Sequence, residues 1–340
     1  MRLIHCCDLR ALGALGAAPP GWRRAGARPA PLAKAHGAAG AVLAAAGFTL
    51  AHAGRHFWAF LRGWPVRWIS TLLPFCLLAP GCAVTSASQP RTAFFYGANM
   101  PVQTLAQFDR VVVEAENVKD LDGLRAAGAD VFAYVSVGEA EGWRASARAL
   151  PPGLFLGANA DWGSRIADLT QPGWRRYLIE QRMAPLWASG YRGFFLDTLD
   201  SYERVARSAP ERQRQASALA ETVRAVSKRF PGVKLLLNRG FAVLPDIGPL
   251  AAGLVAESLF QSWNPATRKY TPVADSERSW LLDRLNEAHQ RYGLPITVID
   301  YVPAEQPQLA RQTARQIRAL GFMPWVSTPG LDIVGVGGEK

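Results

Sequence analysis

Eight short apolar segments recur along this 340-residue chain, and most are separated by stretches with helical periodicity. Each segment is too short for a helix and reads as a buried strand. Strands that alternate with helices predict an α/β fold, and a (β/α)8 TIM barrel of about 250 residues would fit. A doubly wound open sheet is the alternative, but no Gly-rich phosphate loop follows the first segment. The predicted strands are 93–97, 110–114, 131–137, 193–196, 234–237, 253–256, 296–299 and 322–326.

Charge is distributed unevenly along the chain. The formal net charge is +11, but residues 1–82 hold nine Lys/Arg against one Asp. Residues 83–340 hold 29 Lys/Arg against 26 Asp/Glu, without a basic stripe interleaved with aromatic residues. The basic balance therefore belongs mostly to the leader, and nucleic acid is excluded as a partner.

Cysteine and histidine are concentrated in the same leader. All four Cys precede residue 83, and His289 is the only His after it. A zinc site built from His and Cys is nearly excluded in the body, and we expect no metal and no cofactor. Its chemistry must come from carboxylates, hydroxyls, amides and aromatic rings.

The N-terminal part of the chain predicts export. Residues 1–65 form a leader without sustained periodicity, either unstructured or the product of an over-extended translation start. Residues 66–82, preceded by Arg62, combine an apolar run with a small-residue site that ends at Cys82, the pattern of a lipoprotein-type signal peptide. A plain signal peptide or an uncleaved anchor is the alternative. We expect a tether at 83–92, a catalytic domain at 93–332, and a lipoprotein of the bacterial periplasm or outer membrane, or else a secreted protein.

Polar residues end nearly every predicted strand. The stretch 193–197 runs Gly-Phe-Phe-Leu-Asp, and a carboxylate at the tip of a buried strand should open onto a cleft. The alternative is that Asp197 caps a helix that starts near Tyr202. In a barrel all such tips face one mouth. The tip residues are Tyr96, Glu114, Glu139, Asp197, Asn238, Glu257, Asp300 with Tyr301, and Ser327.

A mouth lined by carboxylates and amides suits glycoside hydrolysis. That reaction needs one acid to protonate the leaving oxygen and one carboxylate to attack or to activate water. Aromatic side chains would supply the surfaces on which sugars stack. Trp263, Tyr202 and Trp325 are candidates, although core packing is the favoured explanation for Trp325.

Several phrases of the sequence resemble a known family. They are Tyr96-Gly97, Tyr134-Val135-Ser136-Val137-Gly138-Glu139, Gly193-Phe194-Phe195-Leu196-Asp197, Leu237-Asn238-Arg239-Gly240-Phe241, Ala256-Glu257-Ser258-Leu259 and Asp300-Tyr301-Val302. Over residues 93–330 the chain resembles glycoside hydrolase family 114, the endo-α-1,4-polygalactosaminidases, and the related hydrolase domain of the Pel exopolysaccharide system. The resemblance implies a metal-free barrel that cleaves galactosamine-containing polysaccharide. It places the family's Asp at Asp197 and its Glu at Glu257, whereas Glu114 departs from the expected residue.

These observations lead to a specific hypothesis for the mouth. Asp197 is the nucleophile and Glu257 the acid/base of a retaining endo-glycosidase, Asp197 ionised beside Asn238 and Glu257 in a more apolar setting. Asp200 and Asp300 are expected to hold the substrate. The other substrate-binding candidates are Tyr96, Glu114, Glu139, Tyr202, Asn238, Trp263 and Tyr301.

Two other functions are compatible with parts of this pattern. A non-catalytic carbohydrate-binding barrel lipoprotein would keep the mouth without turnover, and a metal-dependent deacetylase is disfavoured by the scarcity of His. We expect a monomer whose partner is a polysaccharide, with membrane contact only through the anchor or signal segment.

Overall fold

The computed structural model describes residues 89–337. The predicted leader (1–65), the signal segment 66–82 with Cys82 and most of the tether 83–92 lie outside this range. Within it, no helix is both long and apolar enough to cross a membrane.

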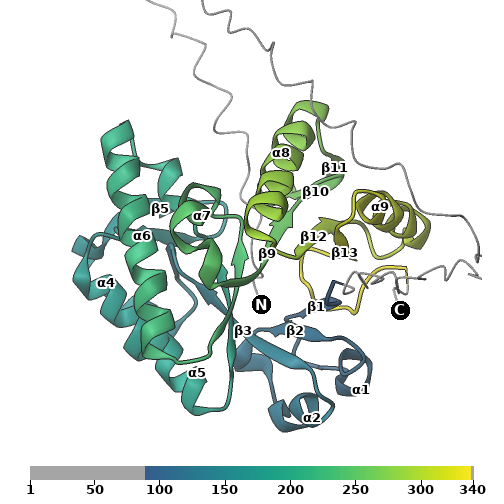
Figure 1. Cartoon of the computed structure of the whole chain (residues 1–340), viewed down its shortest axis with the longest axis horizontal. Coiled ribbons are helices and arrows are strands. Elements are labelled where there is room, and N and C mark those ends of the chain that lie inside the picture. Colours follow the sequence, from purple (N-terminus) through teal and green to yellow (C-terminus); the bar gives the residue numbers. More distant parts are fainter. Residues whose placement is uncertain (1–88, 338–340) are drawn as a thin grey trace, which may run out of the picture. The chain divides into compact units, whose positions relative to one another are not determined.

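Eight parallel strands form the central sheet (Figure 1). In sheet order they are β1 (Thr92–Phe95), β2 (Arg110–Val113), β3 (Asp130–Ser136), β7 (Gly193–Asp197), β8 (Lys234–Asn238), β9 (Ala251–Glu257), β12 (Ile296–Tyr301) and β13 (Met323–Ser327). The chain after β13 returns to β1, where the Tyr96 N–H donates to the Leu331 carbonyl at 2.6 Å. The sheet is thus a nearly closed barrel, and the predicted (β/α)8 fold is confirmed.

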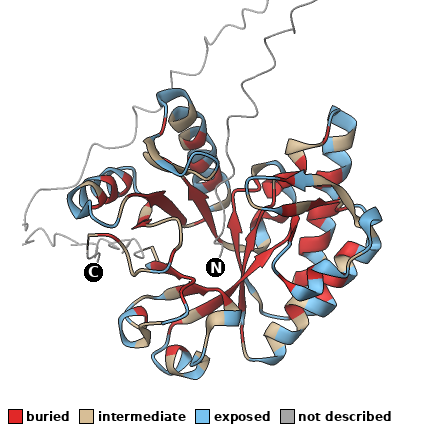
Figure 2. Ribbon diagram, turned by 180° about the vertical axis from the view of Figure 1, so that it is seen from behind, coloured by how far each residue is buried: buried red, intermediate tan, exposed pale blue. Residues whose placement is uncertain are grey.

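The strands carry the core and the helices surround it. In Figure 2 the strands are almost continuously buried, while the helices alternate buried and exposed residues. Aromatic rings fill the barrel interior: Phe94 meets Phe195 edge-on at 5.4 Å between ring centroids. Trp325 is 1% exposed and packs against Phe94 and Phe108, so it belongs to the core.

The longer helices match the sequence periodicity. They are α6 (Ala209–Arg229), α8 (Asp275–Tyr292) and α9 (Pro307–Ala319). Helix α6 is capped by Ser208, whose Oγ accepts the Glu211 N–H, and the Glu211 carboxylate accepts the N–H of the preceding Arg207. Helix α8 ends at Gly293, whose φ of 65° closes the last turn.

One helical segment is interrupted. The segment 172–189 consists of α4 (Pro172–Arg176), a π-helical stretch η4 (Tyr177–Met183) and α5 (Ala184–Ala188). Pro185 lacks the backbone N–H that a regular α-helix would use at this point. The remaining helices are short: α1 (Val102–Leu105), η2 (Ala115–Asn117), α2 (Leu121–Ala126), α3 (Ala145–Arg148), η3 (Pro152–Leu154), η5 (Ser201–Arg204), η6 (Phe241–Val243), α7 (Leu244–Ile247) and η7 (Gly248–Leu250).

Two small sheets lie in the connections that follow β3 and β9. The first is antiparallel and contains β4 (Glu139–Glu141), β6 (Ser164–Ala167) and β5 (Phe155–Asn159). The second is the hairpin of β10 (Gln261–Asn264) and β11 (Lys269–Pro272). Both follow the carboxyl ends of barrel strands, so they build the rim of the mouth.

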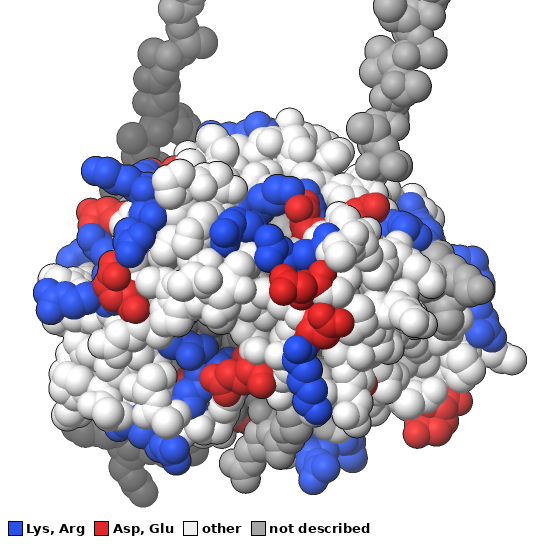
Figure 3. Space-filling view, turned by 90° about the horizontal axis from the view of Figure 1, so that it is seen from below, with Lys and Arg blue, Asp and Glu red and all other residues white. Residues whose placement is uncertain are grey.

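Basic and acidic side chains are interspersed on the face shown in Figure 3, which carries no continuous basic stripe. This agrees with the nearly balanced charge of residues 83–340.

Candidate active site

Three neighbouring strands, β7, β8 and β9, end on Asp197, Asn238 and Glu257. The Asn238 side-chain nitrogen Nδ2 donates to Asp197 Oδ1 and to Glu257 Oε1, at 2.7 Å each. The two carboxylate oxygens are therefore no farther apart than twice 2.7 Å. With the two N–H bonds of an amide about 120° apart, the separation is about 5 Å. One amide holds the two carboxylates as a pair.

The second oxygen of Glu257 is also bound. Tyr301, at the end of β12, donates its hydroxyl to Glu257 Oε2 at 2.6 Å. Asp197 and Glu257 are 1% and 4% exposed. The expected difference between an apolar Glu257 and a polar Asp197 is wrong, because Glu257 shares the Asn238 amide and accepts a phenol as well.

The backbone turns left-handed directly after each of these three tips. Thr198, Arg239 and Ser258 have φ of 60°, 54° and 64°. Non-glycine residues seldom adopt this conformation, and each instance costs on the order of 1–3 kcal/mol. Two of these three residues extend the backbone hydrogen bonding between barrel strands. The Arg239 N–H donates to the Val255 carbonyl and the Ser258 N–H donates to the Ile299 carbonyl, both at 2.8 Å.

Thr198 anchors the first of these turns. Its Oγ1 donates to the Asp197 carbonyl at 2.6 Å and accepts the Gly138 N–H at 2.8 Å. The Thr198 N–H donates to Asp197 Oδ1 at 2.7 Å, which orients the carboxylate. The turn thus fixes the direction in which Asp197 points.

Two buried tyrosines lie next to the carboxylate pair. Burial raises the pKa of Tyr96 well above its ordinary value, and the carboxylates of Asp197, Glu257, Glu114 and Glu141 raise it further. The pKa of Tyr134 is raised by burial and then by Glu141 and Asp197. The two rings are 5.5 Å apart. Both phenols remain protonated. They lie in the electric field of the carboxylates of Asp197, Glu257, Glu114 and Glu141, which together form an acidic chamber.

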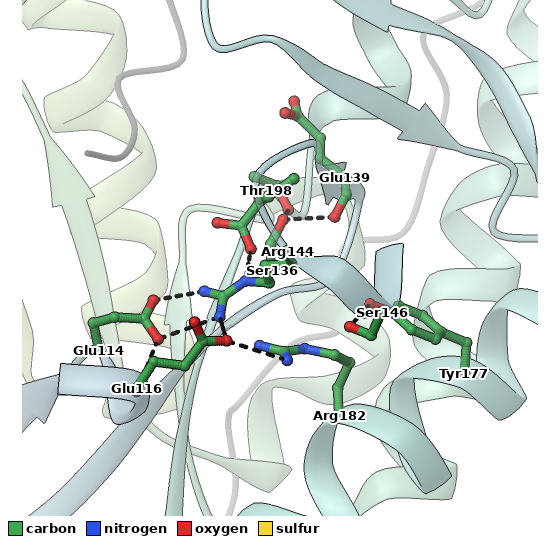
Figure 4. A network of polar contacts seen from close by, with 10 residues as sticks. Glu114, Glu116, Ser136, Glu139, Arg144, Ser146, Tyr177, Arg182 and Thr198 are labelled. Carbon is green, nitrogen blue, oxygen red and sulfur yellow. Dashed lines mark hydrogen bonds and ion pairs between the residues drawn. The ribbon is translucent and has the colours of Figure 1, made fainter. Parts of the chain in front are cut away.

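A buried guanidinium, that of Arg144, binds the Glu114 and Glu141 carboxylates of this chamber (Figure 4). Arg144 bonds to Glu114 at 2.5 Å, to Glu116 at 2.7 Å and to Glu141. Burial alone would lower the pKa of Arg144, but the Glu141 and Glu114 carboxylates raise it above its ordinary value. Glu114, expected to bind substrate, is thus ion-paired at the tip of β2, where it also caps η2.

Two further predicted substrate contacts support loops instead. Glu139 is 3% exposed and accepts from Ser201 Oγ at 2.6 Å, from Asn159 Nδ2 at 3.0 Å and from Ser164 Oγ. Asp300 is 0% exposed and accepts three backbone N–H groups in the loop after Glu257. Burial raises the pKa of Asp300 to about 7, although these N–H groups lower it. Asp300 holds that loop from behind, and its oxygens are occupied.

The chain matches the glycoside-hydrolase family GH114 over residues 81–338. It belongs to this family. The glycoside hydrolase domain of PelA from Pseudomonas aeruginosa is 39% identical, with a TM-score of 0.68, and the match covers 74% of this chain and 100% of that domain. The structure of Aspergillus fumigatus Ega3 in complex with galactosamine matches at 16% identity and a TM-score of 0.52, over 74% of this chain and 98% of Ega3. This likeness shows the shared fold.

An uncharacterized protein of Deinococcus radiodurans is also similar, 26% identical over 216 residues, which are 61% of this chain and 67% of that protein. With the family and the PelA match, the chain is a glycoside hydrolase.

The remaining predicted residues of this GH114 barrel lie outside the pair. Asp200 is half-buried and precedes the short helix η5, so the alternative in which Asp197 caps a helix near Tyr202 is wrong. Tyr202 is 2% exposed, which leaves no ring face for a sugar. Trp263 is half-buried on β10 against Tyr270, with ring centroids 4.7 Å apart.

Sequence reasoning missed Glu141 and Arg144, both in the connection after β3. Their spacing of three residues was the available signal, since it allows an i,i+3 ion pair, but the sequence does not show that both are buried. Among residues 89–337 of this GH114 protein, no group of three or more His, Cys, Asp or Glu could hold a metal ion.

Proposed function

We propose that this protein is an exported, endo-acting, retaining glycosidase that cleaves α-1,4-linked galactosamine and N-acetylgalactosamine polysaccharide. The observation that carries the proposal is the Asn238 amide that joins Asp197 to Glu257 at 2.7 Å on each side. Two carboxylates held at the tips of β7 and β9, on either side of β8, are the minimum equipment of a glycosidase.

The mechanism assigns a separate task to each carboxylate. Protonated Glu257 gives its proton to the leaving glycosidic oxygen while Asp197 attacks the anomeric carbon, which forms a glycosyl ester. Glu257, now ionised, then takes a proton from water, and the resulting hydroxide displaces Asp197. The Tyr301 hydroxyl orients Glu257 and the Thr198 N–H orients Asp197 in both steps.

The carboxylate separation supports retention of configuration. Retaining enzymes place the two groups about 5–5.5 Å apart, whereas inverting enzymes need about 6.5–9.5 Å for an intervening water. Oxygens that share one amide nitrogen lie within the shorter range. An amide in this position also occupies the space that an inverting water would need.

The acidic chamber supports an amino sugar as substrate. The carboxylates of Asp197, Glu257, Glu114 and Glu141 all act on Tyr96. A negatively charged mouth attracts the cationic ammonium group of de-acetylated galactosamine. Asn238 Oδ1 is buried and has no hydrogen-bond partner among the described residues, so it can accept from the sugar's 2-amino or 2-acetamido N–H. The galactosamine in the Ega3 structure is consistent with this substrate class.

Product analysis tests the proposal. The full chain is incubated with α-1,4-galactosamine polymers that are fully, partly or not acetylated, and product size and anomeric configuration are followed by NMR. We expect a rapid fall in polymer mass and α-anomeric first products. Products of β configuration would keep the pair but make Asp197 a base that activates water. No change in mass on any polymer would refute the function.

Export through Cys82 is a separate part of the proposal. It is supported by the signal-type segment in the sequence and by the similarity to the PelA domain. Cys82→Ala should release the protein from the membrane fraction of an expressing cell. Retention of this variant in membranes would replace the lipid anchor with an uncleaved segment.

A further inference from the structure

Trp143 is an exposed aromatic ring on the rim of the barrel. It is 41% exposed, and among residues 89–337 only Trp280 and Leu320 are large hydrophobic side chains with comparable exposure. It follows β4 in the chain, just beyond the buried Glu141. Exposure of a large ring is costly in water, which makes its surroundings informative.

Arg144 fixes one face of this ring. The guanidinium carbon lies 3.9 Å from the centre of the Trp143 ring and over its face. Its own position is set by the bonds to Glu114, Glu116 and Glu141, and its side chain is 2% exposed. The exposed surface of Trp143 therefore comes from its opposite face and its edges. A ring braced in this way is preorganised for a flat ligand.

The ring belongs to the same mouth as the carboxylate pair. Glu114 directly follows β2, and Glu141 acts together with Asp197 on the buried Tyr134 hydroxyl. Trp143 thus lies at the outer end of a continuous set of residues that leads from Asp197 to the rim. A polymer that is cleaved at Asp197 and Glu257 must extend beyond the cleavage site in both directions.

We propose that the open face of Trp143 is a platform for a sugar unit of the polymer outside the cleavage site, and that Glu116 binds the ammonium group of a unit held there. A galacto-configured ring has an axial O4, which leaves one face made of C–H groups that can stack on an indole. The Glu116 side chain is 54% exposed and pairs with Arg144, whose guanidinium lies over this ring. The inference rests on the proposed function and deepens it by one binding subsite.

Trp143→Ala tests the platform, with Trp280→Ala as the matched control. Trp280 is 37% exposed on α8 and meets Phe241 edge-on, whereas the ring of Trp143 is braced by the Arg144 guanidinium. With a long de-acetylated polymer, Trp143→Ala should raise KM roughly two- to thirtyfold, the range expected from loss of a cation–π or stacking contact, with little change in kcat. The Trp280 variant should match wild type. With an oligomer that spans only the cleavage site, both variants should match wild type.

Glu116→Gln separates the charge from the stacking. It should raise KM for the de-acetylated polymer and leave KM for the fully acetylated polymer unchanged, because only the former carries ammonium groups. Trp143→Phe keeps a smaller ring and should give an intermediate KM. It also serves as the test if Trp143→Ala has a lowered Tm.

The outcomes distinguish this inference from the function beneath it. Equal KM values for Trp143→Ala, Trp143→Phe and Trp280→Ala on long polymer, with wild type active, would overturn the platform alone. A similar increase in KM for Trp280→Ala would also overturn it, since the effect would not be specific. A wild-type protein that cleaves no galactosamine polymer would instead remove the proposed function.

Discussion

Carboxylates line both sides of the barrel mouth, but they are held by different groups. At the ends of β7, β8 and β9, Asp197 and Glu257 accept from a neutral amide, and Glu257 also accepts from a neutral phenol. At the end of β2 and along β4, Glu114 and Glu141 are bound by the Arg144 guanidinium. A carboxylate that pairs with a buried cation is not free to attack a substrate or to transfer a proton without first losing that partner. The comparison assigns chemistry to the first side and support to the second.

The largest expected effect is a loss of turnover on the side of the mouth where neutral groups hold the carboxylates, at the ends of β7, β8 and β9. Asp197→Asn and Glu257→Gln keep shape and hydrogen-bonding capacity but remove the nucleophile and the proton donor. We expect turnover to fall by about 10³-fold or more in each, with a Tm close to wild type. Initial rates of polymer cleavage and a thermal melt measure both. Substantial activity in either variant would mean that another carboxylate does the chemistry.

A substitution on the side of the mouth where Arg144 binds the carboxylates should lower the stability of the protein. Arg144→Met leaves the buried Glu114 and Glu141 without their cation, and removal of one partner of a buried ion pair costs about 3–5 kcal/mol. Urea denaturation should show this loss in the free energy of unfolding. A variant that keeps wild-type stability would show that these carboxylates are not held by Arg144, and the contrast between the two sides would fail.

Asp300 sharpens the comparison because backbone N–H groups, rather than a side chain, hold it. Its pKa of about 7 in the folded protein exceeds that of an unfolded Asp, about 3.9. The folded state therefore binds more protons between these values. The contribution of Asp300 is greatest below about pH 4 and is lost as pH rises toward 7, a change on the order of a few kcal/mol.

Asp300→Asn isolates this contribution. The difference in free energy of unfolding between wild type and variant should be larger at pH 4.5 than at pH 8, since only wild type gains the proton. Urea midpoints at both pH values measure it, and other titrating groups cancel in the difference. An equal difference at both pH values would mean that Asp300 does not titrate in this range.

The smallest effect concerns the phenol on Glu257. Tyr301→Phe keeps the ring but removes the 2.6 Å hydrogen bond to Glu257 Oε2. One such bond to a charged group is worth about 1.5 kcal/mol or more, so kcat should fall roughly tenfold with KM nearly unchanged. A rise in KM without a loss of kcat would instead place Tyr301 in substrate binding.

Much of the fold follows from the sequence because strand and helix periodicities are local. The strand predicted at 193–196 is observed as β7 (Gly193–Asp197), and the order of eight strands determined the barrel. The sheet of β4, β5 and β6 was not predicted, since β4 and β6 are only three and four residues long and none of the three strands alternates clearly between buried and exposed residues.

The site was predictable only in its outline. A residue at the carboxyl end of a barrel strand is expected to reach the mouth. This rule predicted that Asp197, Asn238 and Glu257 lie together. It does not tell whether a carboxylate meets a guanidinium, backbone N–H groups or open space, because that depends on distant segments. Glu114, Glu139 and Asp300 were each expected to contact substrate, and each is held by partners 20 to 62 positions away in the sequence.

The left-handed turns after β7, β8 and β9, the strands that end at Asp197, Asn238 and Glu257, have a consequence for protein engineering. Thr198, Arg239 and Ser258 occupy a backbone conformation that glycine would adopt at lower cost. A library selected for heat resistance alone would thus be drawn toward glycine at these positions. Each such replacement would also remove side-chain contacts that aim the neighbouring tip, as Thr198 does for Asp197. Selection for durability and selection for turnover would therefore pull the same three residues in opposite directions.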